Sequence, residues 1–146
     1  MKGATPADVQ RAAGHIMGAS PFGGVCGVVC PDKFCMASCT RGKIDKPIEI
    51  PSVQATIVQR ARELGLFPSF PATPAARKQR VAIIGSGPSG LAAVAVLAQH
   101  GYHIDLYERH ASLLGGVCNT IPEHRLPRHV LEADIAHTLA LGEVSV

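Results

Sequence analysis

The sequence predicts a protein of the α plus α/β class, in which a small helical, cysteine-rich domain precedes an incomplete Rossmann-like (βαβ) domain. Two stretches carry this prediction. Residues 81–90, VAIIGSGPSG, join a short apolar run to a glycine-rich turn, and residues 26–39 contain four cysteines. A chain of 146 residues can hold one domain or two small ones. We predict the helical domain over residues 1–70, a linker over 71–80 and the Rossmann-like domain over 81–146.

The composition excludes several classes of partner. The formal net charge of +3 is too small to indicate nucleic-acid binding. The longest apolar run, near residues 91–98, is far shorter than a membrane span, and the N-terminus lacks the apolar stretch of a signal peptide. We therefore expect a cytoplasmic protein. Five cysteines in a reducing compartment indicate metal or redox chemistry more than disulfides.

The glycine-rich turn fits the dinucleotide-binding pattern G-x-G-x-x-G. It follows a predicted strand and precedes a predicted small-residue helix over 91–99 that ends at His100-Gly101, which is the context this motif requires. Gly85 suits the tight turn, Gly87 lets the backbone approach a pyrophosphate, and Gly90 lets the helix lie close to the sheet. The weaker alternative is a glycine-rich turn in an ordinary α/β protein.

A second part of the same motif lies 23 residues after Gly85. The segment 103–109, HIDLYER, predicts a strand that ends near Glu108. An acidic side chain at this place accepts hydrogen bonds from ribose hydroxyls and repels a 2′-phosphate. The ligand is therefore expected to be an adenine dinucleotide such as FAD or NAD, in preference to NADP. The alternative is a solvated glutamate at a strand end.

The four cysteines are spaced C-x3-C-x4-C-x3-C. Thiolates are the soft ligands of iron–sulfur clusters and zinc, and zinc sites more often show C-x2-C pairs, so the spacing favours iron–sulfur. The Cys30-Pro31 pair resembles the cysteine that ligates a second cluster in two-cluster ferredoxins. Buried free thiols are the alternative to ligation. The candidate ligands are Cys26, Cys30, Cys35 and Cys39.

Helical periodicity and turn residues predict the remaining elements of the first domain. A short amphipathic helix is expected within residues 1–19, and a turn-rich loop over 21–40. Ser52 is expected to cap a helix over residues 53–64, with Gly65 as its stop. The apolar face of that helix would comprise Val53, Ile57, Ala61 and Leu64, and Gln54 would be an exposed polar residue of its first turn.

After the second strand, the sequence predicts a loop over residues 111–116 and an extended segment over 117–127. A helix from residue 128 to about 141 follows, stopped by Gly142, and residues 143–146 begin a third strand. A dinucleotide fold needs this third strand and more to cover its sheet. We therefore expect a fragment or a split gene product with an exposed strand edge.

These motifs, in this order, resemble those of the glutamate synthase small-subunit family. Its relatives are the N-terminal half of dihydropyrimidine dehydrogenase, the bacterial flavoprotein subunit of that enzyme, and the flavoprotein subunit of an electron-bifurcating ferredoxin reductase. The resemblance extends from about residue 12 to residue 146. It is carried by SPFGGVCGVVCP, CMASCTRG, KPIEI, VAIIGSGPSGLAA, YER followed by GG, and IPEHRLPRHVLEADI.

The resemblance implies a helical double [4Fe–4S] domain, followed by an FAD domain into which an NAD(P)H domain is inserted. It implies that Cys30, Cys35 and Gln54 ligate one cluster and that Cys39 ligates the other, whereas Cys26 receives no ligand role from it. Cys118 is expected to be a packing residue. The residues implied to bind FAD are Gly85, Ser86, Gly87, Pro88, Ser89, Gly90, Glu108, Arg109, Gly115, Gly116, Arg125 and Leu126.

The sequence also departs from the family pattern. The upstream cysteine segment and the NAD(P)H domain of the family are absent, four residues instead of five separate Cys30 from Cys35, and the stretch between Gly116 and Ile121 is one residue short. We expect part of an oxidoreductase that passes electrons from NAD(P)H through FAD to iron–sulfur clusters and a partner subunit, and that is not competent alone. The alternatives are a non-catalytic nucleotide- or partner-binding chain and a binding module stapled by one zinc at the four cysteines.

Overall fold

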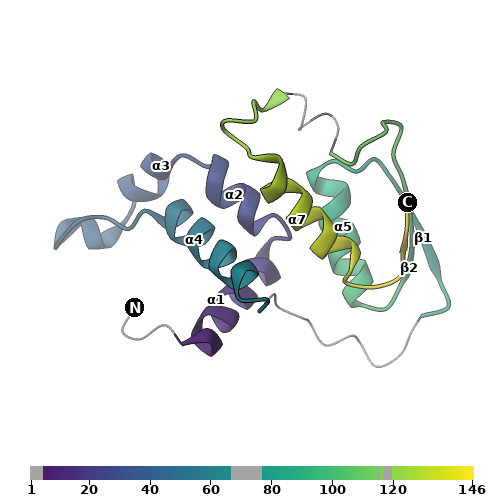
Figure 1. Cartoon of the computed structure of the whole chain (residues 1–146), viewed down its shortest axis with the longest axis horizontal. Coiled ribbons are helices and arrows are strands. Elements are labelled where there is room, and N and C mark those ends of the chain that lie inside the picture. Colours follow the sequence, from purple (N-terminus) through teal and green to yellow (C-terminus); the bar gives the residue numbers. More distant parts are fainter. Residues whose placement is uncertain (1–4, 67–76, 115, 117–119) are drawn as a thin grey trace. The chain divides into compact units, whose positions relative to one another are not determined.

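Helices form the first part of the chain, and a βαβ arrangement forms the second part (Figure 1). The computed structural model describes residues 5–66, 77–114, 116 and 120–146. The first part contains α1 (Pro6–Ala19), α2 (Gly23–Val29), α3 (Asp32–Ala37), the 3₁₀ helix η1 (Thr40–Lys43) and α4 (Ile50–Glu63). The second part contains β1 (Arg80–Ile84), α5 (Pro88–Gln99), β2 (His103–Tyr107), α7 (Arg128–Leu139) and β3 (Val144–Ser145).

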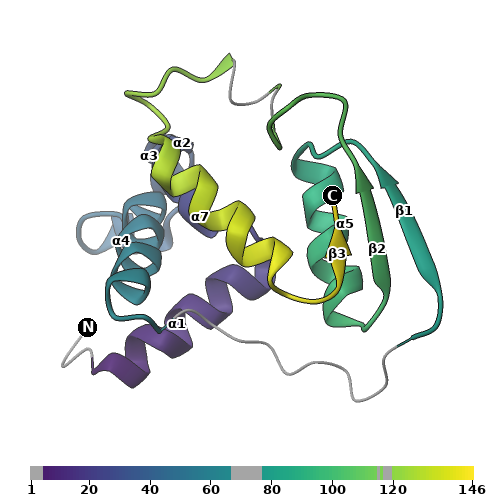
Figure 2. The ribbon, with the colours of Figure 1, turned by 45° about the vertical axis from the view of Figure 1, so that its right-hand side comes forward.

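The three strands form one parallel sheet in the order β1-β2-β3 (Figure 2). Val81 pairs with Ile104 between the first two strands, and Ile104 pairs with Val144 on its other side. Helix α5 packs against β1 and β2, and α7 packs against α5. This is one half of the strand order found in doubly wound dinucleotide-binding sheets. The predicted fold class, a helical region followed by a partial Rossmann-like region, is confirmed.

Strand β1 lies at an edge of this sheet. Its apolar run is typical of a parallel strand that is buried on both faces, but Ile84 is 90% exposed and every second residue of the strand is exposed. Within the described residues, β2 is the only strand that pairs with β1. The predicted exposed strand edge is therefore present, and in the described sheet both β1 and β3 are edge strands.

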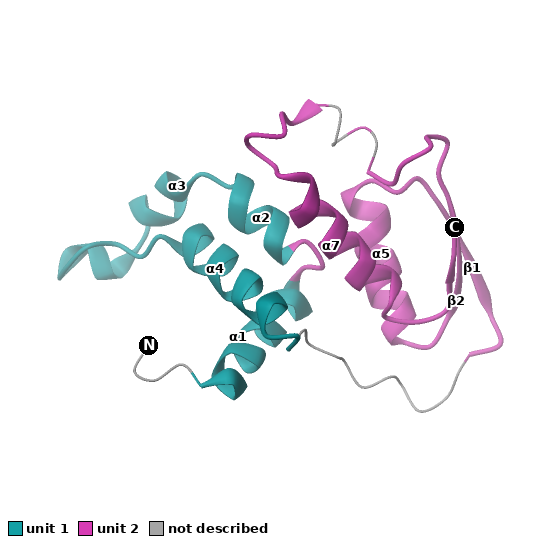
Figure 3. Cartoon of the chain, in the orientation of Figure 1, with its two compact units in different colours: residues 1–19, 23–68 teal, residues 20–22, 69–146 magenta. Residues whose placement is uncertain are grey.

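The chain divides into two compact units (Figure 3). Unit 1 comprises Met1–Ala19 and Gly23–Pro68, and unit 2 comprises Ser20–Phe22 and Ser69–Val146. Most of the predicted linker, residues 71–80, lies outside the described residues, so the linker stays a prediction.

The core of unit 1 forms where α4 packs against α1 and α2. Val9 and Ala13 of α1 are buried against Ala61 of α4, with Ile57 beside them. This confirms the amphipathic helix expected near the N-terminus. Among the described residues, no single helix is long and apolar enough to cross a membrane, and α1 and α2 meet the criteria of length and composition only as a pair bent by 86°.

The glycine- and cysteine-rich stretch that was predicted to be a turn-rich loop instead forms α2, α3 and η1. Its glycines serve helix packing more than turns. A Cβ added at Gly27 would lie 2.6 Å from the backbone nitrogen of Ala55 in α4, and one added at Gly23 would lie 2.6 Å from the sulfur of Met17. Glycine therefore allows α2 to approach its neighbours closely, and this packing outweighs the low helix propensity of glycine.

Helix α4 begins earlier than predicted. Its N-cap residue is Glu49, and Pro51 occupies its first turn, where the missing N–H of proline costs nothing. Ser52 is therefore not the cap; its hydroxyl donates to Asp32 at 3.2 Å. The apolar face is also rotated from the prediction, because Val58 is buried while Val53 and Leu64 are exposed.

The predicted stop of α4 at Gly65 is confirmed. Gly65 has a φ of +63°, and its N–H donates to the carbonyl of Arg62 at 3.0 Å. The N–H of Leu66 donates to the carbonyl of Ala61 at 2.8 Å. This pair of bonds is the Schellman arrangement, which favours glycine because of the positive φ.

Gly27→Ala is predicted to destabilise unit 1, because the new methyl group meets backbone atoms of α4 that cannot rotate away. The expected loss in the free energy of unfolding is about 1–3 kcal/mol, measured by urea denaturation. Gly42→Ala is the matched control, since its Cβ would meet its nearest neighbour at an ordinary 3.7 Å. Equal stability of the two variants would contradict the close packing of α2 on α4.

Candidate functional site

The glycine turn between β1 and α5 has the geometry of a dinucleotide-binding turn. Gly85 has a φ of +96°, and its N–H donates to the carbonyl of Tyr107 at 2.7 Å, which ties the turn to the end of β2. A Cβ at Gly90 would lie 2.0 Å from the carbonyl oxygen of Gly85, so a side chain there is incompatible with the turn. The structure thus explains two of the three glycines by backbone geometry and close approach.

The third glycine, Gly87, leaves space open for a ligand. A Cβ added there meets no atom within 4 Å, and the residue caps the N-terminus of α5. The first N–H groups of a helix have no carbonyl partner within the helix, and they lie at the positive end of its dipole. This arrangement is suited to a phosphate group.

A cavity of about 370 Å³ lies at this end of the sheet. It is lined by five of the residues predicted to bind the dinucleotide and by four residues that were not predicted to bind it. The predicted members are Gly85, Gly87, Glu108, Arg109 and Gly116, and the others are Ile84, Tyr107, His110 and Leu114. His110 lies two residues after the acidic residue of the motif, and this position is the sequence signal that could have placed it among the predicted cavity residues.

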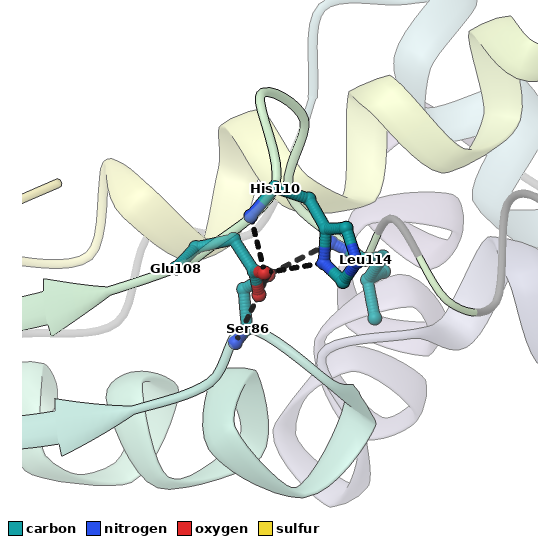
Figure 4. Close-up of polar contacts among 4 residues, drawn as sticks. All are labelled: Ser86, Glu108, His110 and Leu114. Carbon is teal, nitrogen blue, oxygen red and sulfur yellow. Dashed lines mark hydrogen bonds and ion pairs between the residues drawn. The ribbon is translucent and has the colours of Figure 1, made fainter.

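The carboxylate of Glu108 is the centre of a hydrogen-bond network in this cavity (Figure 4). Its Oε2 accepts from the backbone N–H of Ser86 at 2.9 Å and from the Ser86 hydroxyl at 2.5 Å. Its Oε1 accepts from the backbone N–H of His110 at 2.9 Å and lies 2.7 Å from Nδ1 of the same residue. The segment that follows β2 is thereby hydrogen-bonded to the turn that follows β1.

These bonds favour the ionised form of the carboxyl. The hydroxyl of Ser86 makes the largest contribution, followed by the N–H groups of Ser86 and His110 and by the His110 ring, and together they hold the pKa of Glu108 far below its usual value of 4.5. Glu108 is therefore a fixed anion at neutral pH. Its negative charge repels other anions, which is the property that the predicted discrimination against a 2′-phosphate requires.

Ser86 was predicted to belong to the cofactor-binding turn, and its side chain faces the protein. The residue is fully buried, and its hydroxyl accepts the N–H of Leu114 at 2.9 Å while donating to Glu108. Leu114 is itself buried and has a φ of +55°. Ser86 thus joins the glycine turn, the acidic residue and the segment that closes the cavity.

The remaining predicted residues lie in varied positions. Pro88 and Ser89 are exposed in the first turn of α5. The N–H groups of Arg125 and Leu126 both donate to the carbonyl of Pro122, so this part of the segment predicted to be extended is a turn. Arg125 is exposed, Leu126 is buried, and neither lines the cavity beside Glu108. Gly115 and Cys118 lie outside the described residues.

The four clustered cysteines lie on three successive short helices or at their ends. Cys26 lies in α2, Cys30 follows it, Cys35 lies in α3, and Cys39 caps η1. None is buried, which does not fit the alternative of buried free thiols. No group of three or more histidine, cysteine, aspartate or glutamate residues in the described part of the chain could hold a metal ion. In the described part of the chain, the four cysteines are thus not gathered as the ligands of one metal ion.

Backbone groups around Cys39 favour the ionised form of its thiol. Hydrogen bonding by the backbone of Ile48, and more weakly by that of Arg41 and Gly42, lowers the pKa of its thiol below the usual value. A thiol of this kind forms the thiolate, which is the form that binds metal, more readily.

Gln54 was predicted to be an exposed polar residue from the helical pattern. The structure instead gives it a partly buried bond between helices, in which its Nε2 donates to the carbonyl of Gly23 at 2.7 Å. This bond uses the amide nitrogen. The amide oxygen is the atom that could ligate a metal, as the family resemblance implies for this position.

Comparison with known protein families assigns the two regions separately. Residues 1–66 match the family described as dihydropyrimidine dehydrogenase domain II, 4Fe-4S cluster. Residues 83–144 match the NAD(P)-binding Rossmann-like domain. The first match covers the four cysteines and Gln54, and the second covers the glycine turn and Glu108.

Several curated proteins are similar to this chain. The NAD-dependent dihydropyrimidine dehydrogenase subunit PreT of Escherichia coli K12 is 39% identical over 134 residues, which is 91% of this chain and 32% of PreT. Glutamate synthase [NADH] of Schizosaccharomyces pombe is 44% identical over 111 residues, 75% of this chain and 5% of that protein. The NADPH-Fe(3+) oxidoreductase subunit beta of Geobacter sulfurreducens is 34% identical over 124 residues, 84% of this chain and 18% of that protein. The chain therefore spans about a third or less of the length of these relatives.

Glu108→Gln is predicted to change how stability depends on pH. Since the folded-state pKa of Glu108 is lowered, the unfolded chain binds the proton first as the pH falls. The stability contributed by the carboxylate should thus be complete above about pH 4.5 and decline at lower pH. The difference in Tm between wild type and the variant should be largest at neutral pH and shrink toward pH 3.

Glu123→Gln is the control for the loss of one carboxylate, because Glu123 is exposed in the same unit. It should leave the Tm close to that of the wild type at each pH. A Tm difference between wild type and Glu108→Gln that stays constant from pH 7 to pH 3 would contradict the network.

Proposed function

Because the chain belongs to the oxidoreductase family that includes dihydropyrimidine dehydrogenase subunits and glutamate synthase, we propose that it acts in electron input to such an enzyme. In this proposal it binds FAD through the adenosine and pyrophosphate groups, and its cysteines contribute to [4Fe–4S] clusters. The observation that carries the proposal is the Glu108 carboxylate, which lines the same cavity as Gly85 and Gly87.

The residues of the cavity fit the adenosine half of a dinucleotide. The open space at Gly87 and the N–H groups that begin α5 suit the pyrophosphate. Glu108 supplies a fixed carboxylate at the place where this motif contacts the ribose, and the side chains of Ile84 and Leu114 supply apolar walls. The flavin, when bound, exchanges a hydride with NAD(P)H and electrons with iron–sulfur clusters.

NAD shares its adenosine half with FAD, and the matched Rossmann-like family is described as NAD(P)-binding. Direct binding of a nicotinamide dinucleotide in this cavity is therefore the second candidate function. FAD is preferred because the order of features along the chain is the same as in the flavoprotein subunits that the chain resembles. The cysteine region comes first, the glycine turn second and Glu108 third. The two candidates differ in the ligand that binds, which a titration distinguishes.

The described cysteines do not form a complete cluster site by themselves. We propose that Cys30, Cys35 and Gln54 are part of the ligand set of one cluster and that Cys39 is part of another. The remaining ligands would come from a further segment or a partner subunit. The exposed and half-exposed positions of these cysteines are compatible with ligands that approach from outside unit 1.

Gly87→Val is predicted to block FAD binding without changing the fold, because φ at this position is −61° and the added side chain points into open space. Binding of FAD, NAD⁺, ADP-ribose and FMN would be measured by isothermal titration calorimetry. Wild type should bind FAD and ADP-ribose, and the variant at least about tenfold more weakly. Gly42→Ala is the control outside the cavity. Equal affinity for FMN and FAD would contradict recognition through the adenosine half, and tighter binding of NAD⁺ than of FAD would favour the second candidate.

Serine substitutions test the cysteines after anaerobic reconstitution, with iron and sulfide, of the chain together with the segment or partner subunit that supplies the remaining ligands. Cys30→Ser, Cys35→Ser and Cys39→Ser should each lower the bound iron and sulfide, because serine oxygen is a harder ligand than thiolate. Cys26→Ser is the matched control and should leave both unchanged. Stoichiometric zinc without sulfide would overturn the cluster assignment.

A further inference from the structure

The Glu108 carboxylate has no vacant acceptor position for a ribose. A carboxylate offers about four lone-pair positions. Ser86 fills two positions on Oε2, and His110 fills two on Oε1. The side chain is only 10% exposed. A ribose hydroxyl can therefore donate to this carboxylate only when one of the four donors leaves.

The four donors differ in their freedom to leave. Ser86 is fully buried, and its hydroxyl is also held by the N–H of Leu114. The backbone N–H of His110 is held by the turn that follows Glu108. The imidazole of His110 is 43% exposed and lines the cavity. The ring is therefore the donor whose displacement disturbs the least structure.

We propose that the His110 imidazole occupies, on Oε1 of Glu108, the position of a ribose hydroxyl of the incoming adenine dinucleotide, and that ligand binding displaces it. This inference rests on the proposed function. His110 is thus an internal competitor for the ribose site. Because only the fraction of molecules with the ring displaced can accept the ribose, the apparent affinity for the dinucleotide is reduced by that fraction.

The same geometry explains why the carboxylate stays in place while the ring exchanges with the ligand. Both bonds from Ser86 reach Oε2, and the ring reaches only Oε1. Loss of the ring therefore leaves three of the four hydrogen bonds intact. Glu108 keeps its position, and Oε1 gains one free acceptor site on the cavity side.

The test compares affinities for FAD and ADP-ribose in wild type and His110→Ala. The variant should bind both ligands about three- to tenfold more tightly, because no internal donor has to be displaced. His110→Asn, whose amide nitrogen can reach the place of Nδ1, should return the affinity toward the wild-type value. Ser86→Ala should bind more weakly, since Glu108 and the N–H of Leu114 both lose the hydroxyl that holds them.

His103→Ala is the matched control. The Nδ1 of His103 pairs with Glu143 at the opposite end of β2, and neither residue lines the cavity that contains Glu108. This variant removes the same kind of histidine–carboxylate pair and should leave both affinities within about twofold of wild type.

A second readout follows the ring directly. In a ¹⁵N spectrum of the histidine side chains, saturating ADP-ribose should shift the Nδ1 resonance of His110 and leave that of His103 in place. Unchanged or weaker binding by His110→Ala, or an unshifted His110 resonance at saturation, would overturn the displacement. If neither wild type nor any variant binds FAD or ADP-ribose, the proposed function fails and this inference fails with it.

Discussion

The hydrogen bonds between Ser86 and Glu108 connect the segments that follow the two strands of the βαβ unit. Ser86 lies in the turn after β1, and Glu108 follows β2. A carboxylate that is 90% shielded from water must have its lost hydration replaced by donors, and Ser86 supplies two of them from a fully buried position. The shape of the cavity depends on this connection, because the same hydroxyl also holds the N–H of Leu114.

Close backbone approach is the second constraint, and it acts in both units. In unit 2, Gly90 is needed because any Cβ would overlap the carbonyl of Gly85. In unit 1, Gly27 is needed because α2 lies against the backbone of α4. The two glycines have the same physical role, although only Gly90 belongs to a recognisable motif. Glycine-rich sequence therefore indicates a turn at one site and a helix interface at another.

In the cysteine region, the sequence spacing indicated candidate cluster ligands but did not show which of them lie together. Spacing of three or four residues brings side chains together on one helix, but α2, α3 and η1 are separate elements. No set of three or more ligands meets in the described part of the chain. A cluster that used them would draw its other ligands from elsewhere, in agreement with the family to which residues 1–66 are matched.

The sequence by itself determined the elements whose signals are local. The glycine turn and the stop at Gly65 follow from positive φ values that favour glycine, and the strand that ends before Glu108 follows from its short apolar pattern. The tertiary structure decided which faces are buried and which side chains meet. Ser52 lost its predicted capping role because the helix begins at Ile50, with Glu49 as its N-cap residue. The bonds of Gln54 to Gly23 and of Ser86 to Glu108 span 31 and 22 residues. Periodicity within one element contains no information on such pairs, because their free energy depends on how separate elements pack together.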